Sequence, residues 1–230
     1  ADWISGWILN NWELGEEGNN LRMGWEISNR SWPITFKNSK LLNCLPKIVS
    51  SGHLMGNICN KKANELNLPK DLKVIAGTTD SNAGVLATFP KKSDGITILG
   101  STIVIKKFIN EPLSGKGISN HKLLGNWLCG GASNAGAAIL LNFFNIEYVK
   151  ELSKQINPAK STGIDLIPLL KKGERFPIDD PNLEPKLEPR PVSDSLYLHA
   201  ILEGLAKIEA RGWHKLQELG TDLPKQIITI

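Results

Sequence analysis

The stretch Gly95 to Phe108, GITILGSTIVIKKF, limits most strongly what this chain can fold into. β-Branched residues dominate it, and such residues favour an extended backbone packed in a sheet. Gly100 and Ser101 interrupt the run, so we expect two strands joined by a tight turn. The turn has a second interpretation, because exposed backbone N–H groups at a glycine turn can hold phosphate oxygens. The residues alone leave both interpretations open.

Segments with helical and strand-like hydrophobic spacing alternate along the chain, which predicts an α/β protein built of layers. Asn134 to Phe144 follows a Gly/Ala-rich turn and is apolar on most sides, so we expect a buried helix there. Five prolines between Pro177 and Pro191 predict an extended, irregular connection, because proline fixes φ and lacks an N–H donor. The other expected elements are helices around 58–66, 83–89 and 193–220, and strands around 74–77, from 126 onward and at 225–230.

Composition sets outer limits on function. With 230 residues, 41% of them hydrophobic and 22% charged, the chain can bury a sizeable core. The net charge is +4, but the lysines occur as short pairs spread along the chain, which disfavours a nucleic-acid-binding face. No run is apolar for long enough to span a membrane. Cys44, Cys59 and Cys129 have neither metal-ligand nor disulfide-framework spacing, so we expect a reducing compartment, by default the cytoplasm.

Asp80 ends the strand-like stretch VIAGTTD and begins the next helical pattern. One interpretation is helix capping, because Thr and Asp oxygens accept hydrogen bonds from the first N–H groups of a helix. The other is a general base, because α/β proteins place such carboxylates at the carboxyl ends of strands, facing a cleft. The segment alone favours capping without excluding the base.

Two turns of small residues are candidate phosphate sites. The sequence contains neither a G-x-x-x-x-G-K-[ST] loop nor a G-x-G-x-x-G turn, which disfavours a P-loop enzyme and a dinucleotide dehydrogenase. The first turn is Gly100 to Thr102, and the second runs from Gly130 to Gly136 at an expected helix start. A tight hairpin and a helix cap would use the same residues, so each turn is weak evidence when taken alone.

Eight segments occur in a particular order: ADWISGWIL, NNLRMGWE, LPKIVSSGHLMGNI, AGTTDSNAG, GSTIVIK, GGASNAGAA, GERFPIDDP and LHAILEGLAKIEARGW. Together they resemble the FGGY family of carbohydrate kinases, and within it the branch of cyanobacterial and plant D-ribulose kinases once described as xylulose-kinase-like. The resemblance runs through essentially all 230 residues.

The resemblance implies two ribonuclease-H-like (actin-like) α/β domains around a cleft, with the sugar on the first and ATP with Mg²⁺ on the second. Residues 1–92 would be the C-terminal part of the sugar-binding domain, and residues 93–230 the N-terminal part of the ATP-binding domain. A hinge is expected near Lys91 to Gly95, where cleft closure would bring base and phosphate together. The implied reaction transfers the γ-phosphoryl group of ATP to a hydroxyl of D-ribulose, with D-xylulose as the alternative substrate.

The resemblance also assigns roles to residues. Asp80 falls on the catalytic base of the family and is expected to contact the sugar and the metal as well. Asn82 is expected to orient Asp80 or to contact sugar, although polarity at a helix start explains it equally well. Glu174 with Arg175, and Glu203, are family signatures that we interpret as a loop anchor or an interdomain salt bridge. The residues expected to hold ATP come from the two glycine turns: Gly100, Ser101, Thr102 and Gly136.

The chain departs from the family pattern in two places. The sequence has no Asp-x-Gly-Thr strand-turn-strand ahead of ADWISGWIL and no Gly-rich adenosine turn after QIITI. We therefore expect a central portion of a kinase with little or no activity by itself, or a non-catalytic binding remnant, because phosphoryl transfer needs several groups at once. Open sheet edges would favour self-association. A third hypothesis is an actin-like interaction module, since a fold does not dictate function.

Overall fold

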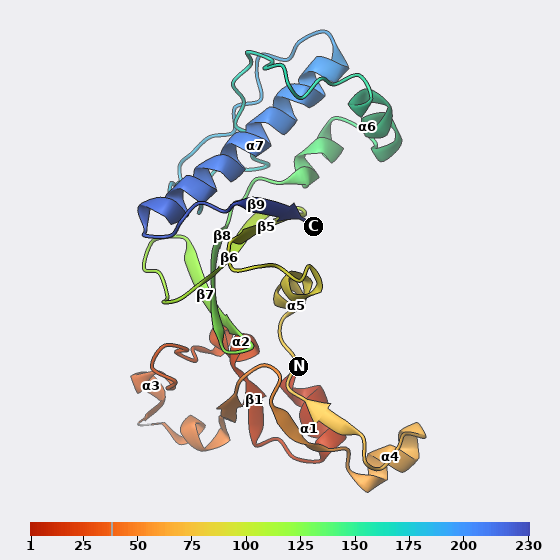
Figure 1. Ribbon diagram of the computed structural model, residues 1–230, viewed down its shortest axis with the longest axis vertical. Coiled ribbons are helices and arrows are strands. Elements are labelled where there is room, and N and C mark those ends of the chain that lie inside the picture. The colour runs from red at the N-terminus through yellow and green to blue at the C-terminus, as the bar shows by residue number, and fades with distance from the viewer. Residues whose placement is uncertain (38) are drawn as a thin grey trace. The chain divides into compact units, whose positions relative to one another are not determined.

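The computed structural model describes residues 1–37 and 39–230. The chain divides into two compact units, Ala1–Phe89 with His121–Leu128 and Pro90–Asn120 with Cys129–Ile230. Figure 1 labels the elements of both units. The assignment of 1–92 and 93–230 to two kinase domains, and the hinge between them, stay predictions.

Short helices and two small sheets build the first unit. Strands β1 and β2 are parallel, whereas β3 and β4 are antiparallel with an irregularity between Leu54 and Gly56. The predicted helices around 58–66 and 83–89 and the predicted strand at 74–77 are present as α4, α5 and β4. The elements are α1 (Asp2–Leu9), β1 (Leu14–Glu16), α2 (Glu17–Asn20), η1 (Leu21–Met23), α3 (Ile34–Lys37), η2 (Lys40–Cys44), β2 (Lys47–Val49), β3 (Leu54–Asn57), α4 (Asn60–Leu66), β4 (Lys73–Ile75) and α5 (Asp80–Ala87).

Tryptophan packing holds part of the first unit together. Trp25 is buried with Ile27 and Ile48, and its ring meets the edge of Trp32 at a centroid distance of 5.3 Å. Edge-to-face contacts of this kind add to the stabilisation that burial itself provides. Trp3, by contrast, is 67% exposed. The tryptophans near the start of the chain therefore divide between core and surface.

A five-stranded sheet with the order β7-β8-β6-β5-β9 is the centre of the second unit, although the end of β7 and the start of β8, within His121–Leu128, belong to the first unit. β5 and β6 pair antiparallel from Gly95 opposite Lys107 to Leu99 opposite Ile103, which confirms the predicted break at the glycine turn. β9 adds parallel to β5 on its other side. The elements are β5 (Asp94–Leu99), β6 (Ile103–Ile109), β7 (Ile118–Leu123), β8 (Asn126–Ala132), η3 (Ala137–Asn142), α6 (Ile146–Ser153), α7 (Asp194–Glu218) and β9 (Gln226–Thr229).

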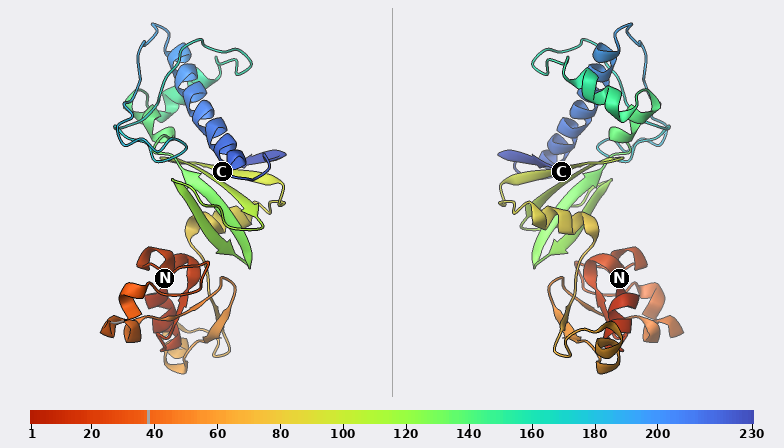
Figure 2. Two further views of the ribbon diagram at one scale, coloured as in Figure 1. Left: turned by 90° about the vertical axis from the view of Figure 1, so that its left-hand side faces the viewer. Right: turned by 90° about the vertical axis from the view of Figure 1, so that its right-hand side faces the viewer.

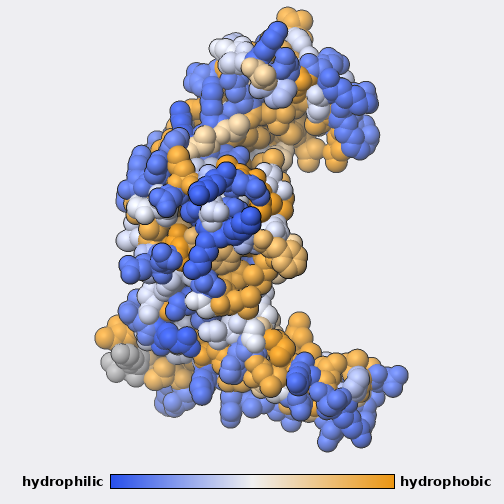
Figure 3. Space-filling model, viewed as in Figure 1, coloured by the Kyte–Doolittle hydropathy of each residue, from blue (hydrophilic) through white to orange (hydrophobic). Residues whose placement is uncertain are grey.

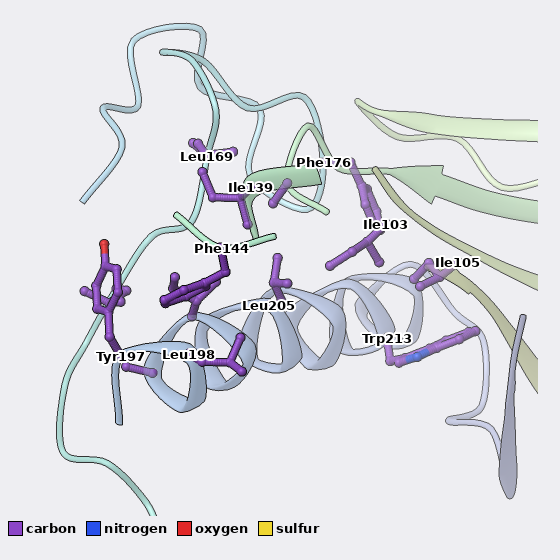
Figure 4. Close-up of a cluster of buried hydrophobic side chains, with 14 of the residues drawn as sticks. Ile103, Ile105, Ile139, Phe144, Leu169, Phe176, Tyr197, Leu198, Leu205 and Trp213 are labelled. Atoms are coloured by element: carbon purple, nitrogen blue, oxygen red, sulfur yellow. The ribbon is translucent and has the colours of Figure 1, made fainter. Parts of the chain in front are cut away.

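The C-terminal end of helix α7 lies against this sheet, and the helix rises away from the sheet toward its N-terminal end (Figures 1 and 2). Its first turn is capped by Ser193, whose Oγ accepts from Leu196 N–H at 3.3 Å, and Gly220 follows its end with φ 107°. Both features match the start and stop expected for this helix. Leu198 and Leu205 of α7 lie in the same buried cluster as Phe144 (Figure 4). Burial of this cluster stabilises the second unit.

The helix predicted from Asn134 to Phe144 is shorter and differently wound. It is the 3₁₀ helix η3, and it begins only after Gly136, whose backbone is extended at φ 176°. Ile139 is buried as expected, but Leu141 is 62% exposed, so the helix is not buried on most sides. The prediction failed because Gly136 is held in contact with another segment, which delays the first helical turn.

The proline-rich connection is irregular, as predicted. Within it the structure forms only isolated bridges, Ile167 with Lys186 and Glu174 with Asp180, in the part of the chain that it describes. Leu183 and Leu187 pack against the core of the second unit, so the connection covers that core. No helix among the described residues combines the length and hydrophobicity needed to cross a membrane.

Glu17, the first residue of α2, is a buried carboxylate in the first unit. Its side chain is 1% exposed, and neither carboxylate oxygen accepts a hydrogen bond of normal geometry from the described residues. Arg30 Nη1 lies 3.9 Å from Oε2 and is itself half exposed. Burial raises the pKa of the Glu17 carboxyl above its ordinary value of 4.5. The fold therefore carries the cost of burying this charge at neutral pH.

Replacing Glu17 by Gln is expected to stabilise the first unit at neutral pH. Because the native pKa is raised, the stability present in full below pH 4.5 is lost as the pH rises through the native pKa. A neutral amide avoids that loss, and we expect a gain of about 1 kcal/mol near pH 7.5 that disappears near pH 4. Urea unfolding followed by tryptophan fluorescence measures this, since every tryptophan except Trp213 lies in the first unit.

The matched control for this change is Glu26→Gln, at an exposed glutamate of the same unit. It should shift the free energy of unfolding by no more than about 0.5 kcal/mol at any pH. Identical pH profiles for wild type and Glu17→Gln would contradict the prediction.

Candidate functional site

Asp80 is the first residue of α5 and is exposed. The residue at the N-cap position is Thr79, and it makes no side-chain capping hydrogen bond. The Oδ1 atom of Asp80 accepts from the N–H of Ser81 at 2.7 Å, whereas Oδ2 accepts no hydrogen bond from the described residues. A carboxylate at this position also interacts favourably with the positive end of the helix dipole. Asp80 thus satisfies the helix start with one oxygen and keeps the other free to act.

Asn82 is a buried residue of α5, and the loop before Asp80 borders a cavity of the first unit. Asn82 is fully buried, and its Nδ2 donates to Thr78 Oγ1 at 3.4 Å. Thr78 lines a cavity of about 230 Å³ together with Glu16, Asn19 and other residues of the first unit. A cavity with hydroxyl, amide and carboxylate groups on its walls suits a small polar ligand. The roles predicted for Asp80 and Asn82 stay predictions.

The two glycine turns, which are distant in sequence, meet in the second unit. A Cβ added to Gly136 would lie 2.4 Å from the carbonyl oxygen of Ser101 and 2.5 Å from Thr102 Cα. These are backbone atoms, so only glycine permits this approach. The next N–H, that of Ala137, donates to the Gly100 carbonyl at 2.8 Å. The turn Gly100–Thr102 and the start of η3 therefore form one continuous wall.

The hairpin turn presents unused backbone donors. Gly100 N–H donates within the turn to the Thr102 carbonyl at 3.1 Å. Over the described parts of the chain, the N–H groups of Ser101 and Thr102 have no acceptor. Ser101 as a whole is an exposed residue. Adjacent free N–H groups in a turn are the arrangement that binds an anion such as phosphate.

An apolar pocket of about 430 Å³ opens beside the hairpin. It is lined by Gly100 and Ser101 of the turn, by Ala137 and Leu140 of η3, and by Val149 of α6. In the space-filling view, hydrophobic surface lies below α6 in this region (Figure 3). A flat, largely apolar ring such as a nucleobase fits a pocket of this size and lining. The second unit thus places a turn with unpaired N–H groups beside an apolar pocket.

Glu203 on α7 anchors a loop, in agreement with one of the two interpretations from the sequence. Its carboxylate accepts from Thr162 Oγ1 at 2.6 Å, from Ser161 Oγ at 2.7 Å and from Thr162 N–H at 3.0 Å. These hydrogen bonds lower the pKa of Glu203 to about 2. The partners all belong to the second unit.

Asp80 is the one predicted metal ligand. Over residues 1–37 and 39–230, no three His, Cys, Asp or Glu side chains gather closely enough to hold a metal ion. Mg²⁺ needs no such cluster, because it keeps several waters and binds through one or two carboxylates and the phosphates of its substrate. An exposed carboxylate with one free oxygen fits this role.

Glu16 and Asn19 were not singled out by the sequence analysis, although both line the cavity of the first unit. The available signal was their position at the carboxyl end of β1, since Glu16 is the last residue of that strand and Asn19 lies three residues further on. The Glu16 carboxylate is already occupied, since it accepts from Gly18 N–H, from Asn19 and from Ser51 Oγ. We assign it a structural role as the cap of α2.

The same fold occurs in solved structures of sugar kinases, while no protein-family model matches the chain. The chain superposes on a xyloylose kinase from Brucella ovis with a TM-score of 0.81 at 18% identity, covering 100% of this chain and 50% of that one. The chain superposes on the glycerol kinase of Plasmodium falciparum with ADP with a TM-score of 0.81 at 12% identity, covering 99% of this chain and 48% of that one. For a xylulose kinase from Rhodospirillum rubrum, the TM-score is 0.75 at 18% identity, and the match covers 99% of this chain and 49% of that one.

The chain therefore has the actin-like α/β fold of carbohydrate kinases, which confirms the predicted fold class. It spans about half the length of the solved structures that it matches. At these identities the likeness concerns the fold, and the residues of the site have to be argued from their own geometry.

Two glycines of the site are expected to respond differently to alanine. Gly136→Ala should destabilise the second unit by about 3 kcal/mol, because its Cβ meets backbone that cannot move aside. Gly100→Ala should cost less than about 0.5 kcal/mol, because its Cβ would approach only the Thr102 carbonyl, at 3.9 Å. Thermal unfolding followed by circular dichroism measures both, and equal costs for the two variants would refute the close approach.

Proposed function

We propose that this chain is a portion of an ATP-dependent carbohydrate kinase of the FGGY type. The kinase phosphorylates a ketopentose, with D-ribulose as the favoured substrate. The observation that carries the proposal is the meeting of the two glycine turns beside an apolar pocket. It occurs in a fold that the chain shares with sugar kinases over its entire length.

The nucleotide half of the proposal rests on the second unit. ATP would place its base in the apolar pocket and its phosphates on the free N–H groups of Ser101 and Thr102. Gly136 supports this role, because a side chain there would push the turn out of position. Asp80 is the carboxylate that would hold Mg²⁺, and the metal would supply positive charge to neutralise the charge that develops during transfer.

The sugar half rests on Asp80 and its free Oδ2. In the proposed step, a sugar hydroxyl oxygen forms a bond to the γ-phosphorus while the bond from that phosphorus to the bridging oxygen of ADP breaks. The hydroxyl proton passes to the Asp80 carboxylate. Asn82 would hold the start of α5 in place, because it is buried in the first turn of that helix, two residues after Asp80.

The choice of D-ribulose comes from the resemblance of the sequence, and D-xylulose is the alternative that the assay must include. We also propose a cytoplasmic location, which agrees with the free thiols of Cys44, Cys59 and Cys129. Self-association of the chain through open sheet edges is part of the same proposal.

The test measures ADP binding and ADP release by the purified chain. We expect ADP with Mg²⁺ to bind, and ADP release from ATP to require a ketopentose in a panel of D-ribulose, D-xylulose, L-ribulose and glycerol. Asp80→Asn should lower the rate by about 10²- to 10⁴-fold, the usual contribution of a general base, while ADP binding persists.

Asp71→Asn is the matched control, because Asp71 is an exposed aspartate of the same unit outside the proposed site. It should leave both measurements unchanged. ADP binding without turnover on any sugar would favour the non-catalytic binding module over the kinase. Absence of ADP binding by folded protein would overturn the proposal.

A further inference from the structure

Glu174 is a buried carboxylate that the proposed chemistry does not use. It is 5% exposed, and its two oxygens accept four hydrogen bonds. The donors are the Ser133 hydroxyl at 2.5 Å, Asn134 N–H at 2.7 Å, Arg175 N–H at 2.8 Å and Phe176 N–H at 3.3 Å. Hydrogen bonds to an ionised carboxylate are stronger than those between neutral groups. The four donors are therefore fixed in position around Glu174.

All three residues of the GER motif bind the same short segment. The Gly173 carbonyl accepts from Asn134 Nδ2 at 3.0 Å, and Arg175 Nε donates to the Ala132 carbonyl at 2.7 Å. Gly173 has φ 100°, a conformation that favours glycine. The motif therefore clamps residues 132–134 with backbone and side-chain groups together.

The clamped segment continues directly into the wall of the nucleotide pocket. Ser133 N–H donates to the Ile103 carbonyl at 2.9 Å, and Ile103 N–H donates to the Ala135 carbonyl at 2.6 Å. Ser133 Oγ also accepts from Ala135 N–H at 2.9 Å while it donates to Glu174. Gly136 comes next and contacts the hairpin turn. The position of that turn is thus linked to the Glu174 carboxylate through one seryl hydroxyl and one strand edge.

We infer that Glu174 is a positioning residue for the nucleotide, which sets the wall 133–137 against the phosphate turn 100–102. This inference rests on the proposed function. Glu174 touches no ligand itself; it acts through Ser133 and Asn134. An amide at this position would turn its NH₂ group toward a donor, so Glu174→Gln breaks the set of acceptors with almost no change of volume.

Glu203 provides the matched control for a purely structural role. Its carboxylate also accepts from a serine hydroxyl and from the backbone N–H of the following residue, in the same unit. Its loop, Ser161 and Thr162, does not line the nucleotide pocket. Glu203→Gln should therefore lower thermal stability as Glu174→Gln does, without affecting the nucleotide.

The experiment titrates wild type, Glu174→Gln and Glu203→Gln with ADP and Mg²⁺ by calorimetry, and follows amide hydrogen exchange in residues 100–103 and 133–137. We expect the Kd for ADP to rise about tenfold in Glu174→Gln, which corresponds to the loss of one good interaction, and to stay within about twofold in Glu203→Gln. Exchange in both segments should accelerate in Glu174→Gln alone. Should Glu174→Gln fail to fold, Ser133→Ala, which removes the linking hydroxyl, is expected to raise the Kd about threefold.

The ADP affinities and the hydrogen exchange together test the positioning role of Glu174. A weaker ADP affinity confined to Glu174→Gln or Ser133→Ala supports the inference, and equal affinities in all folded variants overturn it. If wild type binds no ADP, the proposed function fails, and hydrogen exchange then judges the positioning role by itself. Faster exchange in segments 100–103 and 133–137 of Glu174→Gln or Ser133→Ala, and not of Glu203→Gln, would uphold it, whereas equal exchange would overturn it.

Discussion

The approach of Gly136 to the turn of the β5–β6 hairpin is the contact on which the candidate site of the second unit depends. It requires a residue with no Cβ, because the atoms it meets are backbone. It also explains why η3 starts late, because Gly136 has an extended backbone and the first helical residue is Ala137. A single steric requirement thus shapes both the wall and the hairpin turn that contacts it.

Around this contact the second unit is built for rigidity. The core under α7 fixes β6 and η3 through side chains such as Ile103, Ile139 and Leu205. On the other side of residue 136, the GER motif fixes residues 132–134 by hydrogen bonds, several of them to a buried charge. Apolar packing and charge-assisted hydrogen bonds therefore act on the same short segment from two directions. Preorganised donors of this kind need no rearrangement when a charged ligand arrives.

Much of the fold follows from local pattern. The β-branched run from Gly95 predicts the β5–β6 pair, and the spacing of apolar residues from Ser193 predicts α7, because both elements bury the face that their period defines. Local pattern failed at η3, where packing of Gly136 overrides helical spacing. It also gave no warning of Glu17, since a charged residue in a polar stretch is typically exposed.

Some features of the candidate site also follow from local sequence, whereas others depend on tertiary packing. The sequence by itself determined that Asp80 begins a helix after a strand, that glycine turns stand at 100–102 and 130–136, and, by resemblance, which chemistry they suit. Only the tertiary structure decided that the two turns form one wall, that Glu174 holds that wall and that the apolar pocket lies beside it. The physical reason is range: capping, turn chemistry and hydrophobic period act between residues a few positions apart. Close backbone approach and a buried carboxylate with partners some forty residues away exist only once the chain has packed.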